Sequence, residues 1–203
     1  GLNGLSGSTA LAASLALAYI AHGSDLAAHR DILLLLAAAV VGFLVFNFPL
    51  GKIFLGDAGA YAIGHLLVWL SISILWNAPN VTPLAVLLIF FWPIADTLLA
   101  ITRRLWRGAP IAQPDRMHFH QLVMRAAEII LLGRSRRSLA NPLATTLTLP
   151  FILAPIAAGA LLQSDRAAAA AACTAFSLLF LCTYKAGMWL APKLRRHAVQ
   201  RPQ

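Results

Sequence analysis

One acidic residue of the sequence lies in a setting that suits phosphate chemistry. Asp57 comes near the end of the segment from Asn47 to Ala60, which reads NFPLGKIFLGDAGA. Three glycines beside one carboxylate let a backbone approach a phosphate group closely. Two structural interpretations stay open. Asp57 can cap the helix that begins there, where its charge suits the positive end of the helix dipole, and Lys52 can be a lysine whose ammonium reaches out of a membrane interface.

A second polar segment combines one arginine with two histidines. It reads PDRMHFH and runs from Pro114 to His120. If the chain is extended there, Arg116, His118 and His120 point to one side, and such a group suits a phosphate or diphosphate. If the chain is helical, residues two apart point about 200° apart, so the two histidines diverge. A solvated basic loop is the alternative to a phosphate site.

A third candidate is Asp96, which follows the apolar stretch FFWPIA. An acid inside a membrane span is costly and is a functional candidate for that reason. The alternative is a pairing with an arginine on the same side, such as Arg103, assisted by a bend at Pro93. His65 lies one or two turns into another apolar run and is interpreted as a satisfied interior polar group.

The elements that position these residues are predicted to be membrane helices. Hydrophobic residues make up 60% of the 203 residues, charged residues only 11%, and the mean hydropathy is +0.76. A soluble domain is typically about 25% charged. Apolar runs of about 20 residues can cross a bilayer, and continuous apolar runs indicate helices rather than strands. The sequence therefore predicts an all-α, polytopic membrane bundle that forms a single domain over residues 1–203, with six spans near 5–22, 32–46, 58–76, 83–102, 143–163 and 167–190.

Charge placement predicts how the spans are oriented. If the six spans alternate, every lysine and arginine except Arg30 and Arg166 falls on one side, and cytoplasmic flanks collect such residues. Residues 103–141 are then the main cytoplasmic loop, and a helix over 117–132 within it is predicted to lie along the membrane surface. The net charge of +9 is accounted for in this way, so no nucleic-acid partner is predicted. Cys173 and Cys182 lie in an apolar run and are interpreted as packing residues.

Four segments, taken in order, resemble successive motifs of the polyprenyl-phosphate N-acetylhexosamine-1-phosphate transferases. They are GLNGLSG at 1–7, the segment 47–59, Asp96-Thr97 with Arg103-Arg104, and PDRMHFH at 114–120. Agreement in order and spacing over roughly residues 1–125 is far more specific than any single motif. The last two spans add only hydropathy to the resemblance.

The resemblance implies a multi-pass enzyme of the bacterial inner membrane with a cytoplasmic active site. Its expected reaction transfers a sugar 1-phosphate from a UDP-N-acetylhexosamine to undecaprenyl phosphate and releases UMP. The product, a lipid-linked diphosphosugar, is expected to feed cell-envelope polysaccharide synthesis, such as that of cell wall or lipopolysaccharide. Mg²⁺, or Mn²⁺ in its place, is the implied cofactor, membrane lipid surrounds the protein, and a homodimer is left open.

By position, Asp57 resembles the family's metal-binding aspartate, and Asn47 resembles an asparagine of the nucleotide site. His118 and His120 coincide with loop histidines thought to contact the donor phosphates, so these two and Asp57 are the expected catalytic residues. The other expected substrate contacts are Lys52, Asp96, Asp115 and Arg116.

The sequence departs from the family pattern at Asn3, where many relatives have the second aspartate of an Asp-Gly-x-Asp-Gly motif, and at Gln121, where a further histidine is common. The family's paired aspartates would precede Gly1. The chain is therefore expected to be the C-terminal part of a longer transferase and to be inactive alone. The alternatives are a transporter-like bundle in which Asp57 and Asp96 line a polar path, and a non-catalytic homologue that binds lipid.

Overall fold

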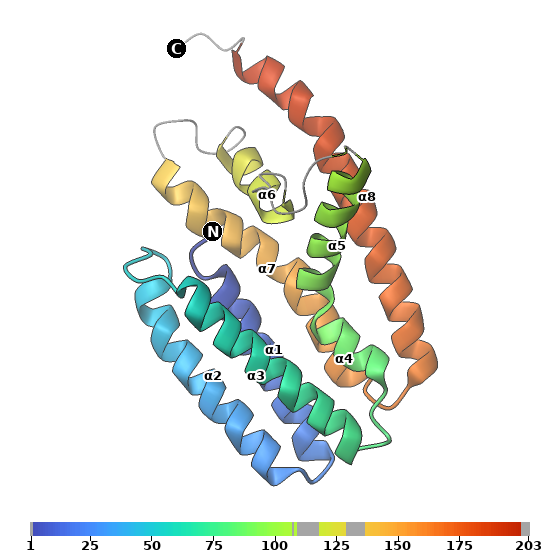
Figure 1. Ribbon diagram of the computed structural model, residues 1–203. Helices are drawn as coiled ribbons and strands as arrows, with labels where there is room; N and C mark the ends of the chain where they lie inside the picture. Colours follow the sequence, from blue (N-terminus) through green and yellow to red (C-terminus); the bar gives the residue numbers. More distant parts are fainter. Residues whose placement is uncertain (1, 107, 109–117, 129–136, 200–203) are drawn as a thin grey trace.

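The computed structural model describes residues 2–106, 108, 118–128 and 137–199, with side chains described only for 139–189 in the last of these ranges. All regular structure in these residues is helical, which confirms the predicted all-α class (Figure 1). The helices are α1 (Leu5–Gly23), α2 (Ala27–Asn47), α3 (Gly56–Asn77), α4 (Pro83–Ile89), α5 (Phe91–Trp106), α6 (Phe119–Ala127), α7 (Arg137–Leu161) and α8 (Arg166–Val199).

Five of these helices, α1, α2, α3, α7 and α8, are long and apolar enough to cross a membrane, and they match five of the predicted spans. The predicted span at 83–102 is instead divided into α4 and α5, which are bent by 76° at Phe90. Pro93 explains the position of the bend, because it has no N–H to donate to the carbonyl of Ile89 and its ring crowds that carbonyl. If the bent pair counts as one span, the number of spans is six, as predicted.

The core lies where α1 meets α2 and where α7 meets α1, α4 and α6. The buried face of α1 is rich in alanine, with Leu17 and Ile20 fully buried. Small side chains let neighbouring helices approach closely in a membrane. α7 is central to the bundle because it contacts both the N-terminal helices and the helices that follow Pro83.

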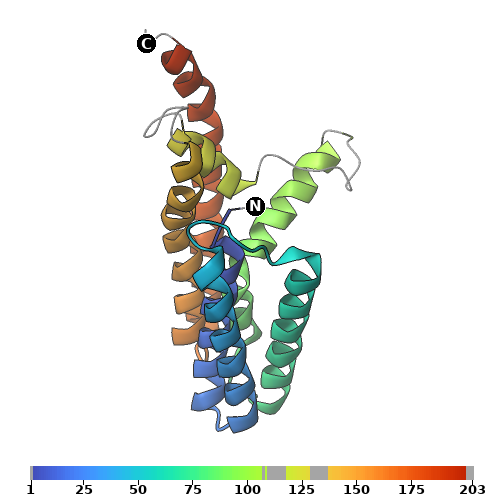
Figure 2. The same cartoon turned by 90° about the vertical axis from the view of Figure 1, so that its left-hand side faces the viewer.

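The sequence candidates gather at one end of the bundle (Figures 1 and 2). This end holds the start of α1, the loop between α2 and α3, the end of α5, helix α6 and the start of α7. Arg30 and Arg166 lie near the starts of α2 and α8, at the opposite end. The helices therefore alternate as the charge distribution predicts, while the compartment that each end faces stays a prediction.

Both ends of the predicted loop 103–141 are helical. Residues 103–106 belong to α5, and residues 137–141 begin α7. Within the described residues 118–128, the helix predicted over 117–132 is present as α6, and 117 and 129–132 lie outside them. The apolar face of α6 packs on the bundle, so it is not free to lie on a membrane surface. Phe119 and Ala127 are buried, and Leu122 and Val123 pack against the core.

His65 corrects the sequence interpretation. Its side chain is exposed on α3 and lies edge-on to the ring of Trp69, with ring centroids 6.0 Å apart. The expectation of a satisfied interior polar group is therefore wrong for the described chain. α3 has few neighbours besides α1 and α2, so this face of the helix is left uncovered.

Candidate functional site

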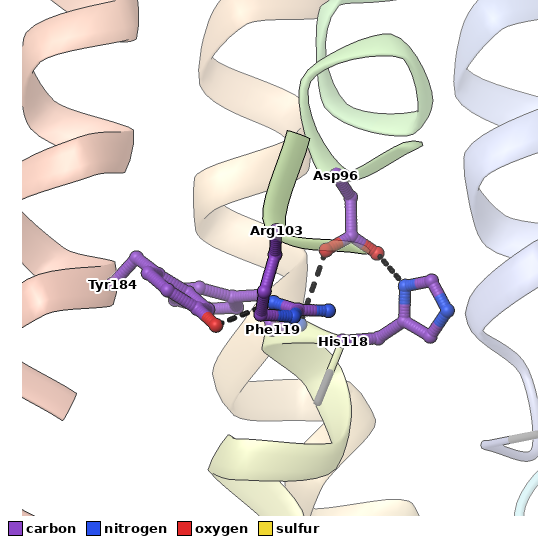
Figure 3. A network of polar contacts seen from close by, with 5 residues as sticks. All are labelled: Asp96, Arg103, His118, Phe119 and Tyr184. Carbon is purple, nitrogen blue, oxygen red and sulfur yellow. Dashed lines mark hydrogen bonds and ion pairs between the residues drawn. The ribbon is translucent and has the colours of Figure 1, made fainter. Parts of the chain in front are cut away.

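Asp96 and the start of α6 form the most closely connected part of the site (Figure 3). Oδ2 of Asp96 lies 2.9 Å from Nδ1 of His118, and Oδ1 accepts a hydrogen bond of 3.2 Å from the backbone N–H of Phe119. That N–H belongs to the first turn of α6 and has no partner within the helix. Asp96 therefore fixes both the imidazole ring and the backbone at the start of α6.

This pairing gives Asp96 a partner within the bundle, while its expected contact with substrate stays a prediction. The side chain of Asp96 is 14% exposed and that of His118 is 28% exposed. Both carboxylate oxygens of Asp96 are engaged by the His118–Phe119 segment, so its partner is a histidine of the polar segment, not the arginine considered from the sequence. Residue type and spacing single out Asp96 and His118 separately and do not predict their contact.

The rings of His118 and His120 lie against each other, with centroids 5.6 Å apart and planes inclined by 11°. His118 precedes α6 in an extended conformation (φ −63°, ψ 149°), whereas His120 is already in the helix. Neither a purely extended nor a purely helical segment describes them, and the change of conformation between them lets the rings converge. Asp115 and Arg116 lie outside the described residues.

Burial lowers the pKa of His120 from its ordinary value of 6.5, because removal from water disfavours the charged ring. The carboxylate of Asp96 opposes this effect, and His118 adds to it. His120 therefore holds a proton less readily than a solvated histidine does.

Aromatic side chains hold the start of α6 in place. Phe119 is 7% exposed, and its ring lies edge-to-face with that of Trp92, with ring centroids 4.8 Å apart. Phe151 of α7 and Phe180 of α8 complete the contact. Beside this cluster, Nη1 of Arg103 donates to the hydroxyl of Tyr184 at 2.5 Å. The polar and aromatic contacts together join α5, α6, α7 and α8.

A second polar group joins the start of α1 to the loop after α2. Oδ1 of Asn47 accepts the N–H of Gly4 at 2.6 Å, and its Nδ2 donates to the carbonyl of Ile53 at 2.7 Å. Asn3 donates from Nδ2 to the carbonyl of Pro49 at 3.0 Å. Asn47 is only 5% exposed, and both ends of its amide bind backbone. Its expected place in a nucleotide site stays a prediction.

Two residues that no sequence motif singles out, Asn141 and Thr145, connect the same polar group to α7. Oδ1 of Asn141 accepts the N–H of Asn3 at 2.7 Å, and Oγ1 of Thr145 donates to the carbonyl of Asn3 at 2.7 Å. A polar Asn141 at the end of an apolar span was the available signal. Its partner lies 138 residues away in the sequence, and no local pattern indicates such a pairing.

Asp57 is exposed in the first turn of α3, and Lys52 is exposed in the preceding loop. The N-cap position of α3 is Leu55, with no side-chain hydrogen bond to the cap, so Asp57 makes no capping hydrogen bond, although its charge does lie in the first turn, at the positive end of the helix dipole. Among the described residues no group of three or more potential metal ligands occurs. Mg²⁺ is usually held by one or two carboxylates together with substrate phosphates and waters, and Asp57, free of hydrogen bonds to the described residues, fits one such carboxylate.

The arrangement is that of a polytopic membrane protein with acidic, imidazole and amide groups collected at one end of the bundle. Residues 1–75 match a family model described as glycosyl transferase family 4. The comparisons with curated proteins agree with the resemblance found in the sequence motifs. The chain is therefore related to the polyprenyl-phosphate N-acetylhexosamine-1-phosphate transferases.

Three relatives illustrate this similarity. The chain is 31% identical over 125 residues to the probable undecaprenyl-phosphate N-acetylglucosaminyl 1-phosphate transferase of Bacillus subtilis (strain 168), covering 61% of this chain and 35% of that protein. It is 33% identical over 157 residues to the decaprenyl-phosphate N-acetylglucosaminephosphotransferase of Mycobacterium tuberculosis (strain CDC 1551 / Oshkosh), covering 68% of this chain and 37% of that protein. It is 34% identical over 94 residues to the undecaprenyl-phosphate alpha-N-acetylglucosaminyl 1-phosphate transferase of Yersinia pestis, covering 44% and 26%.

The chain thus spans about a third of the length of the first two of these relatives. No solved structure matches it significantly.

Proposed function

We propose that the full-length protein transfers a sugar 1-phosphate from a UDP-N-acetylhexosamine to undecaprenyl phosphate. An oxygen of the lipid phosphate attacks the phosphorus that carries the sugar, the bond from this phosphorus to UMP breaks, and a lipid-linked diphosphosugar forms. The observation that carries the proposal is the meeting of Asp96, His118 and His120 at the bundle end that also holds Asp57. The relatives' names and the order of the motifs give it independent support.

The imidazole pair, which consists of the rings of His118 and His120, supplies the phosphate contact in this proposal. Asp96 engages Nδ1 of His118, so Nε2 is the ring nitrogen left for a ligand. A protonated imidazole donates from both nitrogens and suits an anionic oxygen. Asp115 and Arg116, which precede this pair in the sequence, are proposed to contact the same diphosphate.

The loop after α2 supplies the other half of the site. Asp57 is the proposed ligand of Mg²⁺ or Mn²⁺, and such an ion, when bound, offsets the negative charge of the diphosphate. Lys52 offers an exposed ammonium that can attract the donor phosphates from the same loop. Asn47 shapes this loop through its two backbone contacts.

The proposed location is the bacterial inner membrane, with the site on the cytoplasmic face. An acceptor lipid enters from the bilayer, which explains why a hydrophobic bundle carries the candidate residues of the site at one end. The proposed product feeds cell-envelope polysaccharide synthesis, and a homodimer is compatible with this role. The transporter alternative requires polar groups along a path through the bilayer, whereas the candidates on described residues gather at one end.

The test is transfer of label in membranes that contain the full-length protein. Membranes receive undecaprenyl phosphate, Mg²⁺ and one of a panel of labelled UDP-sugars, including glucosamine-, fucosamine- and quinovosamine-type donors. We expect label to appear in a lipid-linked diphosphosugar with release of UMP for at least one donor. Absence of transfer with every donor, in membranes that contain folded protein, contradicts the proposal and favours the non-catalytic homologue.

A further inference from the structure

Asn3 stands where the family motif described above has its second aspartate, and its contacts in this chain are those of a structural residue. Its side-chain amide donates to the carbonyl of Pro49 at 3.0 Å. A carbonyl oxygen only accepts, so the atom facing it must be the amide nitrogen. A carboxylate at this position has no hydrogen to donate and places a second acceptor against the first.

The backbone of Asn3 is fixed from the opposite side. Its N–H donates to Oδ1 of Asn141, and its carbonyl accepts from Oγ1 of Thr145. Both partners belong to α7, and Thr145 is fully buried. α7 is a long helix packed on α1, α4 and α6. Asn3 is therefore attached to a helix that several neighbouring helices hold in place.

Asn3 and its neighbour Gly4 hold the loop after α2 at two points. Asn3 binds the carbonyl of Pro49, while the N–H of Gly4 binds Asn47, whose amide in turn binds the carbonyl of Ile53. Lys52 lies between these two attachments, and Asp57 follows them in the sequence.

The fit around Asn3 is close at one further position. Gly51 has a φ of 62°, and a Cβ placed on it would lie 2.6 Å from Nδ2 of Asn3. The side chain of Asn3 therefore packs directly against the turn of the loop, and a residue other than glycine at position 51 would displace it.

We propose that Asn3 is a positioning residue, which ties the loop carrying Lys52 and leading to Asp57 to the rigid helix α7. The inference rests on the proposed function only for the role of that loop in binding metal and donor. The hydrogen bonds that attach the loop to α7 do not depend on the proposed function. A different interpretation is that Asn3 replaces a functional acid. Under that interpretation Asn3→Asp restores the acid and raises activity, whereas under ours it removes a hydrogen-bond donor and lowers activity.

The first readout does not depend on activity. Amide hydrogen exchange is measured in the full-length protein for residues 47–53, where Gly51 donates to the carbonyl of Asn47 and Lys52 to that of Phe46. A neutral hydrogen bond contributes about 1 kcal/mol, so Asn3→Asp and Asn3→Ala should each speed exchange about fivefold or more. Asn141→Asp is the matched control, since it keeps the acceptor oxygen and should leave exchange near the wild-type rate.

The second readout is the Mg²⁺ dependence of transfer by folded protein. Asn3→Asp should raise the half-saturating Mg²⁺ concentration and lower kcat/KM for the donor about tenfold, whereas partial unfolding alone would lower only the active fraction. Asn141→Asp should resemble the wild type in both quantities. Unchanged exchange over residues 47–53 in both Asn3 variants, or a gain of activity at lower Mg²⁺ in Asn3→Asp, overturns the positioning role. A wild type that shows no transfer contradicts the proposed function, while the exchange result still decides the role of Asn3.

Discussion

Nδ1 of His118 lies 2.9 Å from Oδ2 of Asp96, across a separation of 22 residues in the sequence. The contact joins the helix after the bend at Phe90 to the start of α6 and leaves one nitrogen of His118 for a ligand. The same carboxylate also accepts the N–H of Phe119. Asp96 is thereby a support for the imidazole pair, and its own contact with substrate is not needed to explain its position.

Asp96→Asn should keep the fold but impair transfer. The amide can still accept the N–H of Phe119, but its NH₂ group must now donate to Nδ1 of His118, so the ring cannot take the doubly protonated, cationic form that suits an anionic oxygen. Removal of a carboxylate that orients a metal-bound histidine typically costs about 10- to 100-fold in activity, and we expect a loss of that size here. Asp31→Asn is the control, because Asp31 is an exposed acid paired with Arg30 at the other end of the bundle. Equal transfer rates in the two variants would refute the supporting role of Asp96.

Stability should depend on pH through His120. Its pKa in the folded protein lies below 6.5 because of burial, so below pH 6.5 the unfolded chain binds a proton that the folded chain resists. Stability should therefore fall as the pH falls through this window and should show no such effect above it. Thermal unfolding in detergent between about pH 7.5 and about pH 5.5 should show a smaller loss for His120→Gln than for the wild type. The same loss in both proteins would contradict the assignment.

Phe119→Ala should loosen α6. Phe119 is buried against Trp92, Phe151 and Phe180, and replacement of a buried phenylalanine by alanine typically costs about 3–5 kcal/mol. Amide exchange over residues 119–127 should become faster, and transfer should fall because His118 loses its fixed position. Leu105→Ala removes an apolar side chain that is 60% exposed at the same end and should change neither quantity. Slow exchange in Phe119→Ala would show that the aromatic cluster does not hold the helix.

The number of spans and their alternation were predictable because hydropathy and charge are local properties of the sequence. The bend at Phe90 was foreseeable in part, since Pro93 marks it, but whether a proline kinks a span or divides it depends on the helices around it. The packing of α6 against the bundle was not predictable. An amphipathic sequence specifies an apolar face, and it does not specify whether lipid or α7 covers that face.

The sequence singles out the residues of the candidate site, whose roles stay predictions, but it does not predict the contacts between them. Asp57, Asp96 and His118 stood out by type and spacing, yet the pairing of Asp96 with His118 depends on how α5 leaves the bend. Asn141 offers only the weak signal of a polar residue at the end of an apolar span, Thr145 offers none, and their link to Asn3 spans about 140 residues. The last two helices add only hydropathy to the sequence resemblance, and in the structure α7 provides the support for both polar groups.

The orientation predicted from charge can be tested by cysteine labelling. Cys173 and Cys182 are first replaced by alanine, because Cys182 is exposed. Single cysteines are then introduced as Lys52→Cys, in the loop between α2 and α3, and as Arg166→Cys, at the start of α8; this loop and this helix start lie at opposite ends of the bundle. In intact cells a membrane-impermeant thiol reagent should label only the Arg166→Cys variant, since Lys52 is expected on the cytoplasmic side. Labelling of the Lys52→Cys variant alone would show that the bundle has the opposite orientation.

Asp57→Asn in the full-length protein tests the central claim that this end of the bundle is a metal-assisted transferase site. Asp57 makes no capping hydrogen bond and is exposed, so its structural contribution is limited to the interaction of one charge with the helix dipole, about 0.3–1 kcal/mol. A neutral amide of nearly the same size should leave the thermal stability almost unchanged. It removes the charge that draws a hard dication to the site, so transfer from the UDP-sugar to undecaprenyl phosphate should fall by orders of magnitude and recover little at high Mg²⁺. Near-normal transfer by a folded Asp57→Asn protein at limiting Mg²⁺ would contradict the account.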